Sequence, residues 1–221
     1  FHQEPQAIIA LATQFMRGMK AAGMATTGKH FPGHGAIAPD SHVAEAIDTR
    51  SLDEIMHSDM QPFAQTLPWL DALMPAHVIF SQVDDKPAGF SKIWLKDIIR
   101  DQLKFDGVLF SDDLCMAGAQ AAGDVSARVK AAIEAGCDIA LVCNDRVAAH
   151  EAAETAQELP YPNQNRIKTM CGQIPTWQGD LESTCQQFDY WQQAKQNVTQ
   201  TFFNPQSKSQ ATRSATESKD P

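Results

Sequence analysis

Apolar residues alternate between short continuous runs and helical spacing along the first 159 residues of the chain. The runs that predict buried strands lie at 24–28, 72–74, 107–110 and 138–142. Apolar positions three and four residues apart predict helices at 3–23, 51–65, 93–103, 125–135 and 147–159. Strands separated by helices pair in parallel through right-handed crossovers. The pattern therefore predicts an α/β fold with a parallel sheet of about four strands.

Local signals mark where the first two helices end and begin. Gly23 is a natural stop for the helix at 3–23. Ser51 with Glu54 three residues later is the signature of a capping box, which predicts that the second helix begins there. Pro62 lies inside that helix and predicts a kink.

The number of strands limits the possible architecture. A complete (β/α)8 barrel of the TIM type has eight strands and about 250 residues, so four strands predict half of such a barrel. An open flavodoxin-like sheet is the alternative. After residue 159 the pattern becomes polar and rich in Gln, with one more helix predicted at 180–203. The segment 204–221 has a composition typical of disorder. We therefore expect a barrel domain at 1–159, a helical extension at 160–203 and a disordered tail at 204–221.

Composition and charge exclude several classes of function. The chain has 221 residues, 43% of them hydrophobic and 20% charged, which fits one sizeable globular domain. The net charge of −9 argues against nucleic acid or an anionic membrane surface as a partner. No apolar run reaches the length of a membrane span. The five cysteines are odd in number and form no CxxC pair, which predicts free thiols and a reducing compartment.

Polar residues with useful chemistry follow each predicted strand. They are Lys29-His30, His77, Ser111-Asp112-Asp113 and Asn144-Asp145-Arg146. Parallel strands all end at one face of the sheet, so we expect these groups to converge there although they are far apart in sequence.

Asp112 is the candidate nucleophile at this face. Side chains alternate along a strand, so only one of Asp112 and Asp113 can point toward the centre of the face, and Asp112 shares its direction with Val108 and Phe110. A carboxylate fixed at a strand end suits a nucleophile or a metal ligand. The alternative is that Asp112 or Asp113 merely caps the following segment.

The segment from Lys29 to His42, KHFPGHGAIAPDSH, concentrates acid–base chemistry in a loop broken by Pro and Gly. Asp40 can hydrogen-bond the imidazole of His42 and support its charged form, which makes His42 a candidate general acid/base. Lys29 and His30 can hold sugar hydroxyls or an acyl oxygen. A solvated loop pair and an ordinary surface lysine are the structural alternatives, and His34, between two glycines, is expected to brace the loop.

A zinc site is a second interpretation of the same residues. Its ligands would be His30, His34, His42 and Asp112. The spacing from His30 to His34 crosses Pro32 and Gly33, so helical ligand geometry is lost, and no HExxH signature is present. We therefore expect no metal and no cofactor.

Three motifs in this order resemble one enzyme family. They are KHFPGHG with Asp40-Ser41-His42, then MPAHV at 74–78, then FDGVLFSDDL at 105–114. The sequence is similar to the bacterial β-N-acetylglucosaminidases of glycoside hydrolase family 3 from about residue 1 to residue 144. The resemblance implies a (β/α)8-type barrel, of which this chain would be the C-terminal half.

The resemblance also implies roles for particular residues. Asp112 aligns with the catalytic nucleophile of the family, and His42 with Asp40 aligns with its acid/base pair. Lys29 and His30 align with its sugar-binding pair. The family also uses an Asp and Arg residues from the first half of the barrel, which have no counterpart in this chain.

The function implied is a retaining glycosidase that removes non-reducing N-acetylglucosamine from 1,6-anhydro-muropeptides during cell-wall recycling. The resemblance implies a cytoplasmic enzyme that needs no metal and is a monomer when complete. We expect an isolated half barrel to be a poor enzyme and a marginal fold, because its two edge strands would be open. The competing interpretations are a metal-dependent barrel hydrolase and an inactive truncated sugar-binding fragment.

Overall fold

The structure is a computed structural model that describes residues 2–34, 36, 46–160, 163–172 and 180–203. The chain divides into two compact units, 1–174 and 175–221, which are considered separately below. The predicted tail at 204–221 lies outside the described residues. The domain bounds expected from the sequence stay a prediction.

The first unit alternates helices and strands. Its strands are β1 (Thr27–Phe31), β2 (Ala46–Asp48), β3 (Ala72–Pro75), β4 (Val78–Phe80), β5 (Val108–Asp113) and β6 (Ile139–Leu141). Its α-helices are α1 (Pro5–Ala21), α2 (Leu52–Met56), α3 (Met60–Thr66), α4 (Val125–Ala135), α5 (Arg146–Ala156) and α6 (Gln164–Lys168). Tighter or wider helical segments are η1 (Leu67–Trp69), η2 (Ala88–Phe90), η3 (Ile93–Gln102) and η4 (Ala117–Ala122), of which η3 is a π-helix.

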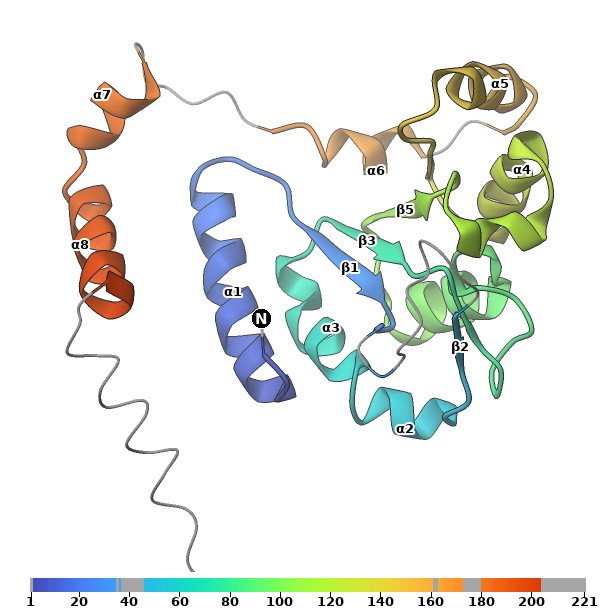
Figure 1. Cartoon of the computed structure of the whole chain (residues 1–221), viewed down its shortest axis with the longest axis horizontal. Helices are drawn as coiled ribbons and strands as arrows, with labels where there is room; N and C mark the ends of the chain where they lie inside the picture. The colour runs from blue at the N-terminus through green and yellow to red at the C-terminus, as the bar shows by residue number, and fades with distance from the viewer. Residues whose placement is uncertain (1, 35, 37–45, 161–162, 173–179, 204–221) are drawn as a thin grey trace, which may run out of the picture. The chain divides into compact units, whose positions relative to one another are not determined.

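The main sheet has four parallel strands in the order β1-β3-β5-β6 (Figure 1). This confirms the predicted α/β fold with about four parallel strands. The short strands β2 and β4 pair in parallel as a separate two-stranded sheet. Neither of these two three-residue strands was predicted from the sequence.

The predicted bounds of β1 are wrong by three residues. The Asp71 carboxylate accepts hydrogen bonds from the main-chain N–H and the hydroxyl of Thr26, and Thr26 is 1% exposed. This contact fixes the chain before the strand, so pairing with β3 begins at Thr27. Lys29 and His30 therefore lie inside the strand and not beyond its end.

The second predicted helix begins as expected and is interrupted earlier than expected. Ser51 accepts from the main-chain N–H of Glu54, and the Glu54 side chain accepts from Ser51, which confirms the capping box. The helix ends at Met56, and α3 begins at Met60. Pro62 lies in the first turn of α3, where its missing N–H costs no hydrogen bond.

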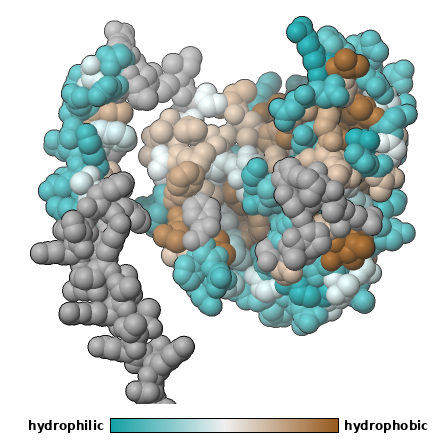
Figure 2. Space-filling view, viewed as in Figure 1, coloured by the Kyte–Doolittle hydropathy of each residue, from teal (hydrophilic) through white to brown (hydrophobic). Residues whose placement is uncertain are grey.

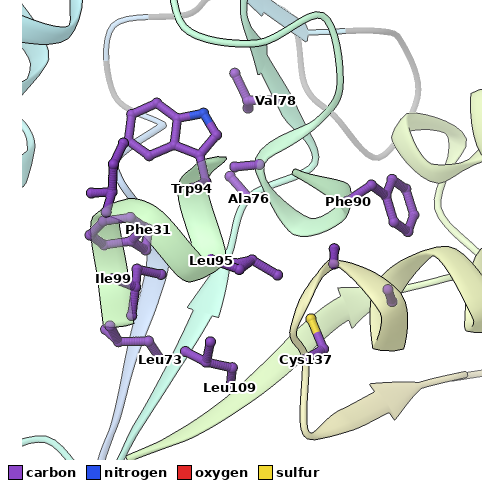
Figure 3. Close-up of a cluster of buried hydrophobic side chains, with 14 of the residues drawn as sticks. Phe31, Leu73, Ala76, Val78, Phe90, Trp94, Leu95, Ile99, Leu109 and Cys137 are labelled. Atoms are coloured by element: carbon purple, nitrogen blue, oxygen red, sulfur yellow. The ribbon is translucent and has the colours of Figure 1, made fainter. Parts of the chain in front are cut away.

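The core lies between the sheet and η3. Trp94, Leu95 and Ile99 of η3 are each 0% exposed, and they lie close to strand residues such as Leu73 and Leu109 (Figure 3). The ring of Trp94 meets that of Phe80 edge-on, with centroids 5.1 Å apart. Such buried aromatic packing commonly contributes about 3–5 kcal/mol per side chain to the free energy of unfolding, which makes η3 a rigid backing for the strands.

All five cysteines lie among the described residues and are free thiols, as the sequence predicts. Burial raises the pKa of the Cys137 thiol to about 12, so it stays protonated at neutral pH. The second unit contains α7 (Leu181–Gln186) and α8 (Asp189–Phe203), where the sequence predicts one continuous helix. Within the described ranges, no helix is long and apolar enough to cross a membrane.

Candidate active site

The carboxyl ends of the main strands carry the candidate chemistry. In the parallel register, Lys29 of β1 lies beside Met74 of β3, and His77 follows two residues after β3 ends. Asp112 and Asp113 are the last residues of β5. The structure therefore places four of the expected residues at the same end of the sheet, as expected for parallel strands. They are Lys29, His30, His77 and Asp112.

Asp112 is buried, and one of its two carboxylate oxygens is held by a hydrogen bond from the main chain. The residue is 7% exposed. Its Oδ1 accepts from the main-chain N–H of Asp113 at 2.8 Å, and its Oδ2 lies 3.7 Å from Nε2 of His30. One oxygen of the Asp112 carboxylate is therefore fixed by the main chain, and the other lies near the imidazole of His30.

Asp113 has a different role, although it is the adjacent residue. Its Oδ1 accepts from the main-chain N–H of Cys115 at 2.9 Å and from that of Cys143 at 3.0 Å. These two bonds join the end of β5 to the segment after β6. The capping interpretation raised for the Ser-Asp-Asp motif therefore applies to Asp113, because the strand alternation turns it away from Asp112.

The burial and the ring stacking of His77 were not predicted from the sequence. It is 1% exposed, and its ring stacks on Phe90 with centroids 5.4 Å apart. Its Nε2 donates to the main-chain oxygen of Asp113 at 3.1 Å. Burial lowers the pKa of His77, even though the charges of Asp112 and Asp113 act in the opposite direction. The sequence marked His77 only as a polar residue at a strand end.

The stem of the loop that follows β1 is anchored on α3. Gly33 has a φ of +147°, and a side chain there would meet the Asp59 Cβ at 2.3 Å, so glycine is required. On the far side of the loop, Arg50 binds the carboxylates of Asp48 and Asp59. Asp40 and His42 lie outside the described residues, so their roles stay a prediction. The expected bracing role of His34 likewise stays a prediction.

A groove runs beside the β1 edge and reaches the site. It has a volume of about 1000 Å³ and extends from α1 along β1 to Lys29, His30 and Gly33. Apolar side chains gather on this face over α1 (Figure 2), including Phe15, which is 61% exposed. The site is therefore reached by an open groove with apolar walls and polar groups at one end.

The zinc interpretation gains no support from the described part of the chain. Among residues 2–34, 36, 46–160, 163–172 and 180–203, no group of three or more His, Cys, Asp or Glu side chains could hold a metal ion. His42, one of the four ligands considered, is outside these ranges.

Comparison with known proteins decides the family. Residues 1–174 match the family described as the glycosyl hydrolase family 3 N terminal domain. The chain belongs to glycosyl hydrolase family 3. It is 56% identical over 172 residues to a beta-hexosaminidase of Pseudomonas aeruginosa (strain LESB58), covering 78% of this chain and 52% of that relative. It is 52% identical over 174 residues to a beta-hexosaminidase of Thiobacillus denitrificans, covering 78% and 48%. The family 3 chain thus spans about half the length of the curated relatives it matches.

Solved structures support the same fold. NagZ from Neisseria gonorrhoeae in complex with N-trifluoroacetyl-D-glucosamine superposes with a TM-score of 0.75 at 40% identity, covering 90% of this chain and 56% of that one. A family 3 beta-N-acetylglucosaminidase from Paenibacillus gives 0.70 at 27% identity, covering 87% and 40%. The four-stranded sheet of this family 3 chain is therefore part of a TIM-like domain, which supports the barrel over the flavodoxin-like alternative.

Proposed function

We propose that this chain carries the nucleophile and acid/base of a retaining β-N-acetylglucosaminidase. The substrate class would be small carbohydrates with a non-reducing terminal N-acetylglucosamine. Curated relatives at 52–56% identity are beta-hexosaminidases, which supports a hexosaminidase activity. A related solved structure binds N-trifluoroacetyl-D-glucosamine, which supports this sugar as the occupant.

The observation that carries the proposal is the environment of Asp112. A buried carboxylate at the carboxyl end of a parallel strand, with one oxygen fixed by a main-chain N–H, has little freedom to lose in the transition state. Its second oxygen lies 3.7 Å from Nε2 of His30, a residue that lines the open groove. Asp113 is the weaker candidate, because its carboxylate already binds two main-chain amides, those of Cys115 and Cys143.

The reaction would proceed by double displacement. Asp112 attacks the anomeric carbon while the bond to the leaving oxygen breaks, and a glycosyl-enzyme forms. In our proposal His42 gives a proton to the leaving oxygen and then takes one from water, which attacks the same carbon and releases Asp112. Asp40 would support the imidazolium form of His42. Lys29 and His30 would hold sugar hydroxyls, and no metal is needed.

The biological substrate belongs to the same proposal. We expect muropeptides derived from peptidoglycan, which contain 1,6-anhydro-N-acetylmuramic acid, and hence a role in cell-wall recycling in the cytoplasm. This expectation rests on the family resemblance of the motifs at 29–42, 74–78 and 105–114. Release of N-acetylglucosamine from purified anhydro-muropeptides tests it, and hydrolysis of aryl glycosides without any release from muropeptides would contradict it.

The roles of Asp112 and His42 are separated by leaving-group dependence in the active enzyme. Asp112→Ala should abolish turnover of every N-acetylglucosaminide, because no covalent intermediate can form. His42→Ala should nearly spare the first step for a nitrophenyl glycoside, whose leaving group needs little protonation. The second step still needs a base, so a burst and a glycosyl-enzyme on Asp112 should appear. Asp40→Asn should show the same leaving-group dependence as His42→Ala, with a smaller loss of turnover.

An exposed histidine provides the matched control. The side chain of His57 is 73% exposed on α2, so His57→Ala should leave turnover unchanged. Equal losses for good and poor leaving groups in His42→Ala, with no trapped intermediate by mass spectrometry, would exclude the role proposed for His42. A glycosyl adduct on a residue other than Asp112 would exclude the nucleophile.

A further inference from the structure

His77 is a buried polar residue beside the proposed nucleophile that the mechanism above does not use. It lies two residues after the end of β3 and is 1% exposed. Its ring stacks on Phe90 at an interplanar angle of 27°, and its Nε2 lies 3.1 Å from the main-chain oxygen of Asp113. Burying a polar side chain costs free energy unless it is hydrogen-bonded, and only one ring nitrogen of His77 has a hydrogen-bond partner among the described residues.

The hydrogen bond fixes the chemical form of the imidazole. A carbonyl oxygen can only accept, so Nε2 of His77 must carry the hydrogen and Nδ1 must be the lone-pair nitrogen. That Nδ1 is buried and has no hydrogen-bond partner among the described residues. Burial lowers the pKa of His77 despite the nearby charges of Asp112 and Asp113. His77 is therefore a neutral N–H donor at neutral pH.

The main chain after Asp112 is held from three directions. His77 binds the main-chain oxygen of Asp113 from the end of β3. The Asp113 carboxylate binds the N–H of Cys115 in the turn after β5 and the N–H of Cys143 after β6. The N–H of Asp113 itself donates to Oδ1 of Asp112. Fixing residue 113 thus fixes the donor that orients the Asp112 carboxylate.

We propose that His77 and Asp113 are positioning residues for Asp112, holding the peptide after it so that its carboxylate stays oriented for attack. This inference rests on the proposed function, since it concerns the proposed nucleophile. A neutral imidazole at His77 suits this positioning role better than a charged imidazolium. An imidazolium beside Asp112 would stabilise the carboxylate before reaction and so oppose attack.

The first test does not depend on activity. Histidine ¹⁵N NMR of the 221-residue chain at pH 7 should show His77 as the neutral Nε2–H tautomer, with its pKa below the ordinary value. Titration of His77 near the ordinary value of about 6.5, or an Nδ1–H tautomer, would overturn the inference. This result stands even if the enzyme proves to have another substrate.

The second test separates positioning from mere stability in the active enzyme. His77→Gln keeps an N–H donor of similar reach, and His77→Leu removes it. A small displacement of a reacting group can cost roughly 10- to 100-fold in rate, so His77→Leu should lose that much kcat on an aryl N-acetylglucosaminide. KM should change by less than about threefold, because the interaction acts in the transition state. His77→Gln should recover most of the lost kcat.

The controls distinguish a failure of the positioning role of His77 from a failure of the proposed function. His150 is an exposed residue of α5, and His150→Leu should leave kcat unchanged. Wild-type kcat in His77→Leu, or no recovery in His77→Gln, would overturn the positioning role. Should His77→Leu not fold, Asp113→Asn against Asp113→Ala makes the same comparison, because Asn keeps an oxygen acceptor for the two amides. A wild-type enzyme without hexosaminidase activity would refute the proposed function and leave the NMR result to decide the chemical form of His77.

Discussion

The two ends of the main sheet treat their carboxylates in opposite ways. At the amino end, Asp138 accepts from Arg100 and Arg166 at 2.9 Å each and from the main-chain N–H of Leu109 at 2.8 Å. At the carboxyl end, Oδ2 of Asp112 lies 3.7 Å from the imidazole Nε2 of His30. Both aspartates are at least nine-tenths buried.

A second carboxylate at the amino end follows the same rule. Asp71 precedes β3 and accepts from both Lys20 Nζ and the main-chain N–H of Thr26 at 2.8 Å. Full pairing neutralises a buried charge and joins distant segments, which stabilises the fold. Among the described residues, the Asp112 carboxylate has fewer partners, namely the main-chain N–H of Asp113 and, at 3.7 Å, Nε2 of His30. The comparison shows that the amino end of the sheet holds its carboxylates in networks that stabilise the fold, while the candidate nucleophile lies at the carboxyl end, where TIM-type barrels have their active sites.

The largest expected effect comes from Asp138→Asn. Loss of the charge would leave Arg100 and Arg166 facing each other without their shared carboxylate. Removing one partner from a buried ion pair commonly costs about 3–5 kcal/mol, and we expect that decrease in the free energy of unfolding. Denaturant unfolding measures it, with the exposed Asp101→Asn as the control. A loss below about 1 kcal/mol, the range of surface pairs, would remove the distinction between the two ends.

Asp71→Asn should have an intermediate effect. It weakens hydrogen bonds to a charged acceptor, each of which contributes about 1.5–3 kcal/mol, although the Lys20 and Asp71 side chains are 32% and 21% exposed. We expect a loss toward the lower figure, measured by the same unfolding experiment. A loss equal to that of Asp138→Asn would show that burial does not set the ranking.

Acid should destabilise the amino end through Asp71. Burial by itself raises the pKa of Asp71, but the bonds from Lys20 and Thr26 together lower it below its ordinary value. A group with a depressed folded pKa stabilises the protein above its unfolded value of about 3.9, and this contribution is lost as the pH falls through the folded pKa.

The free energy of unfolding should therefore fall below about pH 4, by at most about 1.4 kcal/mol per pH unit for one group. Unfolding measured from pH 6 to pH 2 should show a shallower slope in Asp71→Asn than in the wild type. The exposed Asp85→Asn should keep the wild-type slope. Identical slopes in Asp71→Asn and the wild type would contradict the assignment.

The smallest stability effect is expected for Asp112→Asn. The amide keeps an oxygen acceptor for the N–H of Asp113 and releases no buried cation cluster. We expect a change within about 1 kcal/mol in the free energy of unfolding, while glycosidase turnover in the active enzyme is lost. A loss as large as that for Asp138→Asn would show that Asp112 is a structural residue.

The sequence by itself determined the main alternation of helices and strands and the end of the sheet at which the candidate residues lie, although it missed β2 and β4. Apolar runs and capping signals are local, so they identify β3, β5 and α2 without reference to the rest of the chain. The alternation of side chains along β5 also favoured Asp112 over its neighbour. The motifs at 29–42, 74–78 and 105–114 indicated the family that the comparisons then confirmed.

Features that depend on contacts between residues far apart in the sequence could be seen only in the tertiary structure. Arg100 and Arg166 meet Asp138 across 38 and 28 residues of sequence, a separation at which no local pattern exists. The same holds for Thr26 and Asp71, whose hydrogen bond explains why β1 begins later than the sequence predicted. The burial and tautomer of His77 depend on Phe90 and on a carbonyl 36 residues away. Periodicity records which residues seek the interior, but the partners they find there are set by packing in three dimensions.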